Sequence, residues 1–475
     1  MLIACISHYL LLNIAVGVWA ARRIKTSQDF VLAGRGLSLT LATSVTFATW
    51  FGSESIMGAP AKFVEEAPKG GILSIIEEPF GSALCLFLVG AFFARPLYEK
   101  NITTFSDYFR IRFGRPAELL SAVIMIPSYF SWIAAQYIAI GIVFNVVMGI
   151  PMAWGISASA SIVMIYTLLG GMWSISITDF VHNLIIILAL LVLAFVLYPQ
   201  VGGFSGVAAK MPDHFFQFLP NLNSPATGID GWATYLAAWM TIGLGSIPQQ
   251  DVFQRVMSAK SARVAVRASY LASGLYLTVA VLPLFIALAA RLLHPGLAGV
   301  DPMAEEQNRQ LIIPNMVMQH GNLPLQVLFF GALTSAILSV SSGAILAPAT
   351  VFGENILKFF RPGISDHQLL TAIRWAIVVI SVLCVAMTLQ RTTSIFDLVG
   401  ESSAFSLVSL FVPLTAGIYW RRANLRGCLW SIVAGLGVWL FCGWLETRFP
   451  PMLWGTLASA AAMVTGSLWE IAKET

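Results

Sequence analysis

Charged residues are scarce in this 475-residue chain. Asp, Glu, Lys and Arg together make up 11% of it, whereas 57% is hydrophobic and the mean hydropathy is +0.80. Soluble globular domains carry about 25% charged residues, so this composition excludes an ordinary soluble fold. The net charge of +4 is spread over short connecting segments and not along one face, so we expect no nucleic-acid partner.

Motifs of enzymes are also missing. The six histidines lie far apart, no His-Glu-x-x-His or phosphate-binding loop occurs, and no Ser, His and Asp stand at catalytic spacing. The five cysteines form no pair at metal or redox spacing and are most simply small core residues. We therefore predict that the protein is not an enzyme, with no catalytic residues and no site for an organic cofactor.

Long apolar runs fill most of the chain, and each is about the length that crosses a bilayer, roughly 20 residues as a helix. They predict an all-α integral membrane protein of about thirteen helices in contact with lipid. The predicted spans are 2–20, 38–58, 70–94, 116–147, 152–170, 174–198, 231–254, 268–292, 323–357, 368–389, 394–420, 427–445 and 452–472. The first run is not a signal peptide, because its basic residues follow it.

The positions of Lys and Arg predict how these helices are oriented. With the N-terminus outside, 19 basic residues fall in inside connections and tails and seven fall outside. Cytoplasmic connections of membrane proteins carry this excess. We expect a multi-pass protein of the plasma (inner) membrane with its N-terminus outside and its C-terminus in the cytoplasm.

Two of the spans are interrupted by polar and flexible residues. Residues 48–55 read Ala-Thr-Trp-Phe-Gly-Ser-Glu-Ser, and residues 243–250 read Gly-Leu-Gly-Ser-Ile-Pro-Gln-Gln. A central charge costs about 2.5–3.5 kcal/mol on insertion scales, so such a residue usually faces a cavity or a ligand. Broken helices in corresponding positions of two halves are typical of mid-membrane binding sites in transporters.

Five stretches around these breaks resemble motifs of the sodium/solute symporter family. They are residues 29–35, 48–58, 170–179, 254–260 and 336–339, and they follow the family's order along nearly the whole chain. Within the family, the resemblance is greatest to the high-affinity choline transporter branch. The stretches that carry this second resemblance are residues 48–52, 92–96, 247–250 and 253–255.

The resemblance implies a LeuT-type fold built from two inverted five-helix repeats. They would span 38–198 and 231–420, with one helix before them and two more over 427–472, all in a single transporter domain. It also implies a Na⁺ site. Its ligands would be the backbone carbonyls of Ala48, Phe51 and Ala336 and the hydroxyl of Ser339.

The ion site departs from the family pattern at Val340, where a second hydroxyl residue is usual. Ser342 or a water molecule is the candidate replacement. Asp179 falls where some members supply a carboxylate near a further Na⁺ site. The alternative for Asp179 is a helix N-cap, because Thr178 and Asp179 would open the sixth span.

Aromatic and polar residues near the breaks are the candidates for substrate binding. Matching positions of the choline branch hold three tryptophans, and this chain has Trp50, Trp132 and, at the third, Gln249. Aromatic faces suit a quaternary ammonium group, whereas an amide suits a carboxylate, hydroxyl or amine. The whole predicted substrate set is Trp50, Ser53, Glu54, Ser55, Glu78, Trp132, Gln136, Gln249, Gln250 and Asp251.

Several carboxylates in this set have two interpretations. Glu54 pairs with a cationic substrate or takes a proton. Glu78, with Glu77, reaches the same cavity or forms an acidic pair at the membrane interface. Asp251 is placed to meet a positively charged substrate amine.

The leading hypothesis is a secondary transporter that couples Na⁺ to the symport of a small polar or amine-containing solute by alternating access. A solute sensor that keeps the fold without transporting, and a proton-coupled or uncoupled transporter, are the alternatives. The sequence leaves the substrate, the stoichiometry and the oligomeric state open.

Overall fold

The computed structural model is helical throughout the residues that it describes, which are 26–65, 70–221, 228–295, 309–390 and 394–474 with scattered positions before residue 26. In these ranges the only β-type pairing is an isolated bridge between Leu37 and Ala259. The predicted all-α class is therefore confirmed. The predicted first span, 2–20, lies largely outside the described residues.

Helices of the first half precede a connection at residues 222–227, and those of the second half follow it. The first-half helices are α2 (Ser27–Leu32), η1 (Ala33–Arg35), α3 (Leu39–Phe47), η2 (Glu54–Gly58), α4 (Ala59–Phe63), η3 (Ile72–Ile75), η4 (Ile76–Gly81), α5 (Ser82–Leu88), η5 (Val89–Phe93), α6 (Ala94–Tyr98), α7 (Phe105–Phe113), α8 (Arg115–Ser128), α9 (Phe130–Met148), α10 (Met152–Leu197) and α11 (Gly203–Ala208). The second-half helices are α12 (Gly228–Gly245), α13 (Gln250–Met257), α14 (Ala262–Val279), α15 (Val281–Leu293), α17 (Ile312–His320), α18 (Leu323–Val351), η6 (Phe352–Leu357), α19 (Lys358–Phe360), α20 (Asp366–Thr388), α21 (Ile395–Ser406), η7 (Leu407–Phe411), α22 (Val412–Tyr419), α23 (Leu425–Trp444) and α24 (Pro451–Glu474).

Side-chain caps fix where several helices begin. Thr104 and Asp107 form a reciprocal capping box at the start of α7, and Ser365 and Gln368 form another at the start of α20. Each box satisfies backbone N–H groups that have no partner within the helix. Eight segments of the described chain are individually long and apolar enough to cross a membrane. The count of thirteen and the repeat boundaries stay predictions.

A sharp bend at Gly171 divides α10 into two membrane-length halves. Gly171 has a positive φ of 49°, and a Cβ there would lie 2.6 Å from the carbonyl oxygen of Phe30. The bend accordingly separates the predicted spans 152–170 and 174–198. Asp179 lies eight residues after it, inside the second half. The N-cap interpretation of Asp179 is wrong, because the helix has already begun before Thr178.

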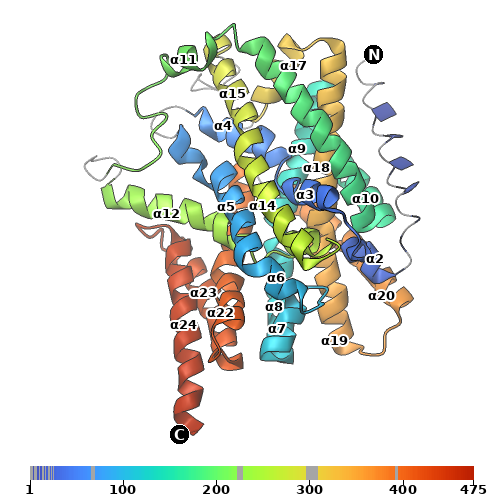
Figure 1. Cartoon of the computed structure of the whole chain (residues 1–475), viewed down its shortest axis with the longest axis vertical. Helices are drawn as coiled ribbons and strands as arrows, with labels where there is room; N and C mark the ends of the chain where they lie inside the picture. The colour runs from blue at the N-terminus through green and yellow to red at the C-terminus, as the bar shows by residue number, and fades with distance from the viewer. Residues whose placement is uncertain are drawn as a thin grey trace.

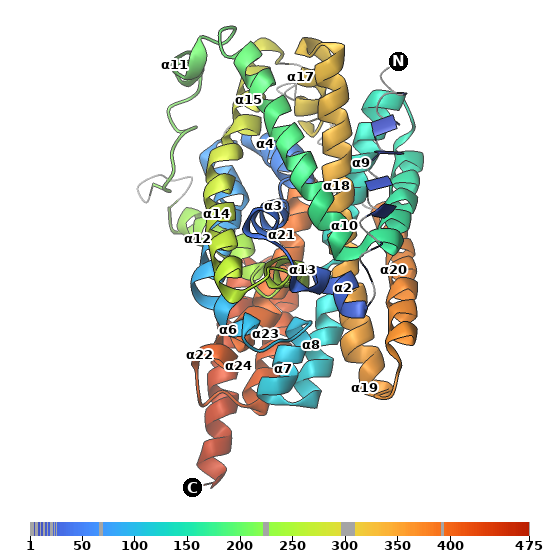
Figure 2. The same cartoon turned by 45° about the vertical axis from the view of Figure 1, so that its right-hand side comes forward.

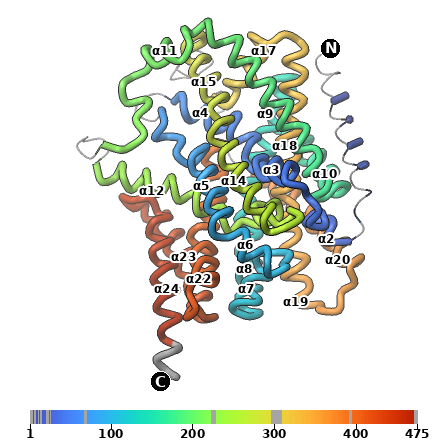
Figure 3. The backbone as a smooth tube through the Cα atoms, viewed as in Figure 1, coloured from blue at the N-terminus to red at the C-terminus, as the bar shows by residue number. Residues whose placement is uncertain are grey.

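The two broken helices lie at the centre of the bundle. Figure 1 shows α3, α5 and α14 side by side in the middle, with α18 and α10 passing along one side, and these elements pack on one another. Figure 2 shows α13 deep inside the bundle and α20 at its edge. Helices α23 and α24 pair at one side, and α24 reaches beyond the rest (Figure 3). The core therefore surrounds residues 48–58 and 246–257.

Candidate functional site

The first break is a run of turns that replaces one and a half turns of helix. Helix α3 ends at Phe47, residues 48–52 form turns, and the helix resumes at Ser53 and continues into the π-helical η2. The amide of Gly52 bonds the carbonyl of Trp50 at 2.8 Å, only two residues away. The carbonyl of Gly52 still accepts a bond from the Ile56 amide at 3.1 Å, whereas within the described residues those of Ala48 and Phe51 accept no backbone bond in this run and are available to a ligand.

Glu54 lies just past the break, among groups that donate hydrogen bonds to its carboxylate. The amide of Gln136 donates to its Oε1 at 2.8 Å, and the indole N–H of Trp132 donates to the same oxygen. The Ser53 hydroxyl contacts the other oxygen at 3.0 Å. Only 1% of Glu54 is exposed. In the described ranges no Lys, Arg or His nitrogen lies within 4.0 Å of this carboxylate.

Glu78 lies on the other side of η2, among hydroxyl groups. Ser55, Ser82 and Tyr276 all bond its carboxyl group, the last at 2.7 Å. Glu77 does not share this environment, because one of its oxygens approaches Gly400 of α21. The two neighbouring carboxyls therefore serve different contacts, and Glu78 is buried in the core.

The second break contacts α21 and α9. A Cβ on Gly245 would lie 2.3 Å from the carbonyl oxygen of Ser403, so only glycine permits this approach of α12 to α21. The Gln249 amide reaches Ser402 Oγ at 3.3 Å, and its Oε1 is buried without a hydrogen bond. Asp251 accepts a bond from the Tyr129 hydroxyl at 2.8 Å.

Gln250 is placed differently from the rest of the predicted substrate set. Its amide oxygen accepts a bond from the Phe105 N–H at 2.9 Å, and its nitrogen donates to the Thr103 carbonyl at 3.1 Å. Both ends of this amide are thus used to hold the start of α7 against α13.

The first break packs on the turn of α18 that carries Ser339 and Ser342, two of the predicted ion ligands. A Cβ on Gly52 would lie 3.5 Å from Val340 Cγ2, so the break and this turn of α18 are in contact. The hydroxyls of Ser339 and Ser342 and one oxygen of Asp179 are buried and make no hydrogen bond of normal geometry within the part of the chain that the structure describes. Such buried oxygens are costly unless a cation or water satisfies them.

Arg255 of α13 lies beside the same turn of α18. Its Nη1 bonds an oxygen of Asp179 at 3.0 Å and the carbonyl oxygen of Val45 at 2.7 Å. Its Nη2 would lie 2.8 Å from a Cβ on Gly343. Arg255 therefore balances the charge of Asp179, so the unbonded oxygens around Ser339 form a neutral or weakly charged set suited to a monovalent cation.

The site is closed to both ends of the molecule. Trp50, Glu54 and Trp132 are each at most 1% exposed. At the end near α4, Lys62 lies 3.9 Å from Asp397 of α21, and Arg309 lies 2.8 Å from Glu65. These charged contacts connect the first broken helix to α21 and to residues before α17.

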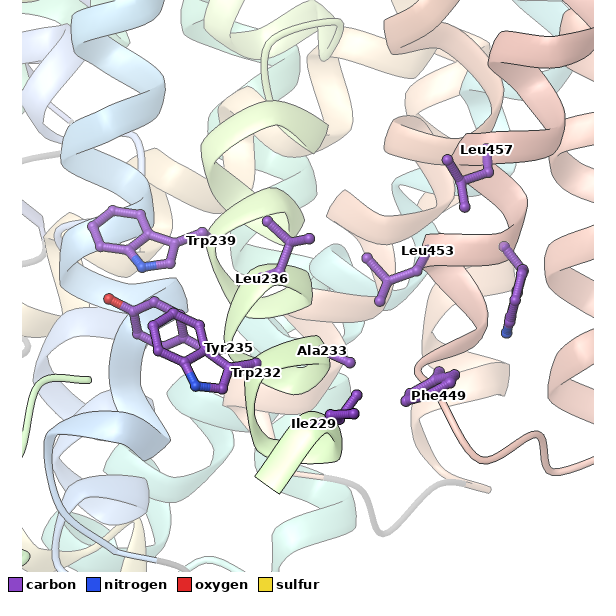
Figure 4. A pocket seen from close by; sticks show the side chains of 10 residues that line it. Ile229, Trp232, Ala233, Tyr235, Leu236, Trp239, Phe449, Leu453 and Leu457 are labelled. Atoms are coloured by element: carbon purple, nitrogen blue, oxygen red, sulfur yellow. The ribbon is translucent and has the colours of Figure 1, made fainter. Parts of the chain in front are cut away.

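Two large apolar hollows occur among the described residues at the periphery. Figure 4 shows one between α12 and the start of α24, with Leu236 and Ile229 on one wall and Leu453 and Phe449 on the other. Its volume is about 550 Å³. None of the residues that line it belongs to the predicted substrate or ion set, so this hollow is separate from the central site.

Sequence reasoning missed four side chains that complete the site: Tyr129, Ser82, Tyr276 and Arg255. Tyr276 and Ser82 lie in helices whose periodic apolar pattern hides single polar residues, and their partners are 198 and four residues away in the chain. Arg255 was visible in a motif, yet its contact with Asp179 spans 76 residues. No local signal identifies such distant pairs.

Comparisons with known proteins decide the family. A profile of the Sodium:solute symporter family matches residues 30–435. The chain belongs to this family. It is 30% identical to the high affinity choline transporter 1 of Homo sapiens over 455 residues, which cover 92% of this chain and 75% of that protein. It is 23% identical to the sodium/glucose cotransporter of Vibrio parahaemolyticus over 469 residues, covering 94% and 85%.

A solved structure confirms the fold. The substrate-bound, outward-open state of a Na⁺-coupled sialic acid symporter aligns with a TM-score of 0.83 at 18% identity, covering 98% of this chain and 97% of that one. The predicted LeuT-type fold is thereby confirmed. Because the family consists of symporters, the prediction of a multi-pass membrane transporter and not an enzyme is also confirmed.

Proposed function

We propose that this protein couples Na⁺ to the symport of a small organic solute that carries a positively charged amine. The observation that carries the substrate class is Glu54. Its carboxylate is buried beside Trp132, holds two N–H donors on one oxygen, and has no basic side chain within 4.0 Å in the described chain. A buried carboxylate without a cation is unfavourable, and a bound ammonium group would balance it.

Aromatic rings around Glu54 support the same substrate class. Trp50 lies edge-on to Tyr276 at 6.4 Å, and Trp132 lies 6.0 Å from the ring of Tyr129. Faces of such rings attract a cation by about 0.5–2 kcal/mol. Gln249, with a free amide oxygen in the second break, supplies an acceptor for the polar end of the solute.

The Na⁺ site in this proposal lies between the first break and α18. Ala48, Phe51 and Ala336 provide backbone carbonyls, Ser339 and Ser342 provide hydroxyls, and the Asp179 oxygen that Arg255 leaves unbonded completes the set. Na⁺ is a cargo ion here. Its binding would hold the break against α18 and so favour the closed pocket.

Uptake into proteoliposomes tests the substrate class. Labelled choline, proline and lactate represent a cation, a zwitterion and an anion, each tested with an inward Na⁺ gradient. We expect choline to accumulate most and Glu54→Gln to reduce its uptake by roughly 10–100-fold, because a hydrogen-bonded charge contributes about 1.5–3 kcal/mol. Glu99→Gln, which alters an exposed pair with Arg95, is the matched control and should leave uptake unchanged.

Three outcomes contradict parts of this proposal. Preferred uptake of lactate excludes the cationic substrate. Choline binding without uptake under any gradient favours a sensor over a transporter. Equal uptake in Na⁺ and in K⁺ excludes Na⁺ coupling.

Paired serine variants test the ion site. Ser339→Ala removes a hydroxyl that makes no hydrogen bond, whereas Ser341→Ala removes one already bonded to the Ile337 carbonyl at 2.5 Å. We expect the half-saturating Na⁺ concentration for choline uptake to rise about tenfold in Ser339→Ala and to change little in Ser341→Ala, one ligand being worth about 1.4 kcal/mol. Equal behaviour of the two variants would place Na⁺ elsewhere.

A further inference from the structure

The Glu78 cluster has more oxygen contacts than hydrogens to fill them. Ser55 Oγ lies 2.7 Å from the Tyr276 hydroxyl and 3.2 Å from the Trp50 carbonyl oxygen, and both hydroxyls also bond Glu78 Oε1. Carbonyl and ionised carboxylate oxygens only accept. With an ionised Glu78, two hydroxyl hydrogens would have to serve four contacts.

One additional proton on Glu78 removes most of this shortage. The carboxylic acid then donates to Tyr276, Tyr276 donates to Ser55, and Ser55 donates to the carbonyl of Trp50 in the first break. Ser82 remains as donor to the second carboxyl oxygen. In this arrangement the hydroxyls of Tyr276 and Ser55 each donate one hydrogen bond and accept another, which a hydroxyl group can do.

A comparison of the hydrogen-bond partners of Glu54 and Glu78 indicates which of the two carboxyl groups carries the additional proton. The oxygen of Glu54 that is bonded by Trp132 faces an N–H group, which cannot accept a hydrogen bond. All the side-chain partners of Glu78 are hydroxyls, and each of them can accept. The other oxygen of Glu54 contacts the Ser53 hydroxyl, which also contacts Gln136 Oε1 at 2.9 Å. Because two N–H groups already donate to one oxygen of Glu54, this carboxyl suits a negative charge better than Glu78 does, and Glu78 suits a neutral acid.

A metal cation fits this cluster less well than a proton. Hard cations such as Ca²⁺ hold their oxygen ligands at about 2.3–2.6 Å, which separates neighbouring ligand oxygens by roughly 3 Å or more. The oxygens around Glu78 Oε1 are within direct hydrogen-bond distance of one another. They leave space for hydrogens between them and not for an ion.

We propose that Glu78 is a proton-binding site of the transporter, linked through Tyr276 and Ser55 to the broken backbone at Trp50. The titratable groups near it on packed elements are Glu54 of η2, Tyr276 of α14 and Cys85 of α5, with Glu77 beside it in η4. When the break rearranges to admit or release solute, the hydrogen bond from Ser55 to the Trp50 carbonyl is lost. The row of hydrogen bonds that begins at Glu78 then has no final acceptor. Proton binding at Glu78 is thus linked to closure of the pocket, a consequence that rests on the proposed transport function.

Infrared spectroscopy of the purified full-length protein in lipid tests the site without any transport assay. A protonated carboxyl has a C=O stretching band that a carboxylate lacks. At neutral pH we expect wild type minus Glu78→Gln to show the loss of one such band, whereas wild type minus Glu54→Gln shows none. The opposite assignment, or no difference in Glu78→Gln, would overturn the proposal.

Two milder variants keep the test decisive if Glu78→Gln does not fold. Tyr276→Phe and Ser82→Ala retain the acid but each removes one hydroxyl partner, so the band should persist at a shifted frequency. Glu77→Gln is the matched control and should leave that band in place. An unshifted band in both hydroxyl variants would overturn the assignment.

Two further measurements, one with added Na⁺ and one of uptake, distinguish a failure of this inference from a failure of the proposed function. Addition of Na⁺ should leave the Glu78 band in place, and its disappearance would show that Na⁺ and not a proton occupies the cluster. In proteoliposomes, the pH dependence of choline uptake should flatten in Glu78→Gln. A confirmed infrared band with no uptake at all would refute the transport proposal while leaving the proton site standing.

Discussion

Val340 lies on the turn of α18 that touches the first break. It is in contact range of Gly52 and directly follows Ser339, whose hydroxyl has no hydrogen bond. An isopropyl group at this place supplies no ligand oxygen. The proposed ion site therefore has one hydroxyl fewer than the family pattern.

Replacing Val340 by threonine should strengthen Na⁺ binding. The new hydroxyl has nearly the same shape as the methyl group that it replaces and adds one oxygen beside Ser339. We expect the half-saturating Na⁺ concentration for thermal stabilisation to fall about tenfold, which corresponds to about 1.4 kcal/mol. Val340→Ala is the control, since it changes volume without adding oxygen. An identical Na⁺ response in both variants would contradict the site.

The sequence indicated which polar residues belong to a site, but it did not indicate which groups they bond. The polarity of Glu54 in an apolar span indicated a site, and the structure places its carboxylate against Trp132 and Gln136. Gln250 looked equivalent to Gln249 in sequence, yet its amide holds the start of α7. Which neighbour uses a polar group depends on long-range packing, and a local pattern carries no information on it.

At the scale of helices, the bend in α10 depends on one glycine. Gly171 combines a positive φ of 49° with a Phe30 ring carbon 2.5 Å from the position of a Cβ. The sequence predicted two spans here, 152–170 and 174–198, and the bend lies between them. The N-cap at Asp179 was wrong because polar residues after a glycine pair resemble a helix start, although this helix had begun earlier.

Gly171→Ala should therefore destabilise the protein. Left-handed strain costs about 1–3 kcal/mol, and the clash with Phe30 adds to it, so we expect the Tm in detergent to fall by roughly 2–6 °C. Gly274→Ala is the matched control, because it lies in α14 with open space around it. Alanine there should leave the stability unchanged or raise it by up to about 1 kcal/mol, so the Tm should stay the same or rise slightly. Equal Tm changes would show that the bend tolerates a side chain.

For the whole molecule, the closed state depends on contacts between the first broken helix and the second half of the chain. Lys62 lies in the last turn of α4 and Glu65 just after it, and their charged partners Asp397 and Arg309 lie more than 240 residues further on. The family resemblance predicted the overall fold because its motifs span nearly the whole chain. It could not predict these closing contacts, since they belong to one conformation of the fold.

Weakening this closure should expose the residues beneath it. Phe396 lies under the contact and is 8% exposed, so a cysteine there should react slowly with a maleimide. In that background Glu65→Gln removes the charge that Arg309 contacts at 2.8 Å and Lys62 at 3.7 Å. If these pairs contribute about 0.6–1.4 kcal/mol to closure, labelling should accelerate roughly three- to tenfold. The same protein with Phe396 retained measures labelling of the native cysteines, and Glu99→Gln in the Phe396→Cys background controls for loss of a carboxylate elsewhere. An unchanged rate would show that the pocket is closed by the packing of α4 on α21 and not by these charges.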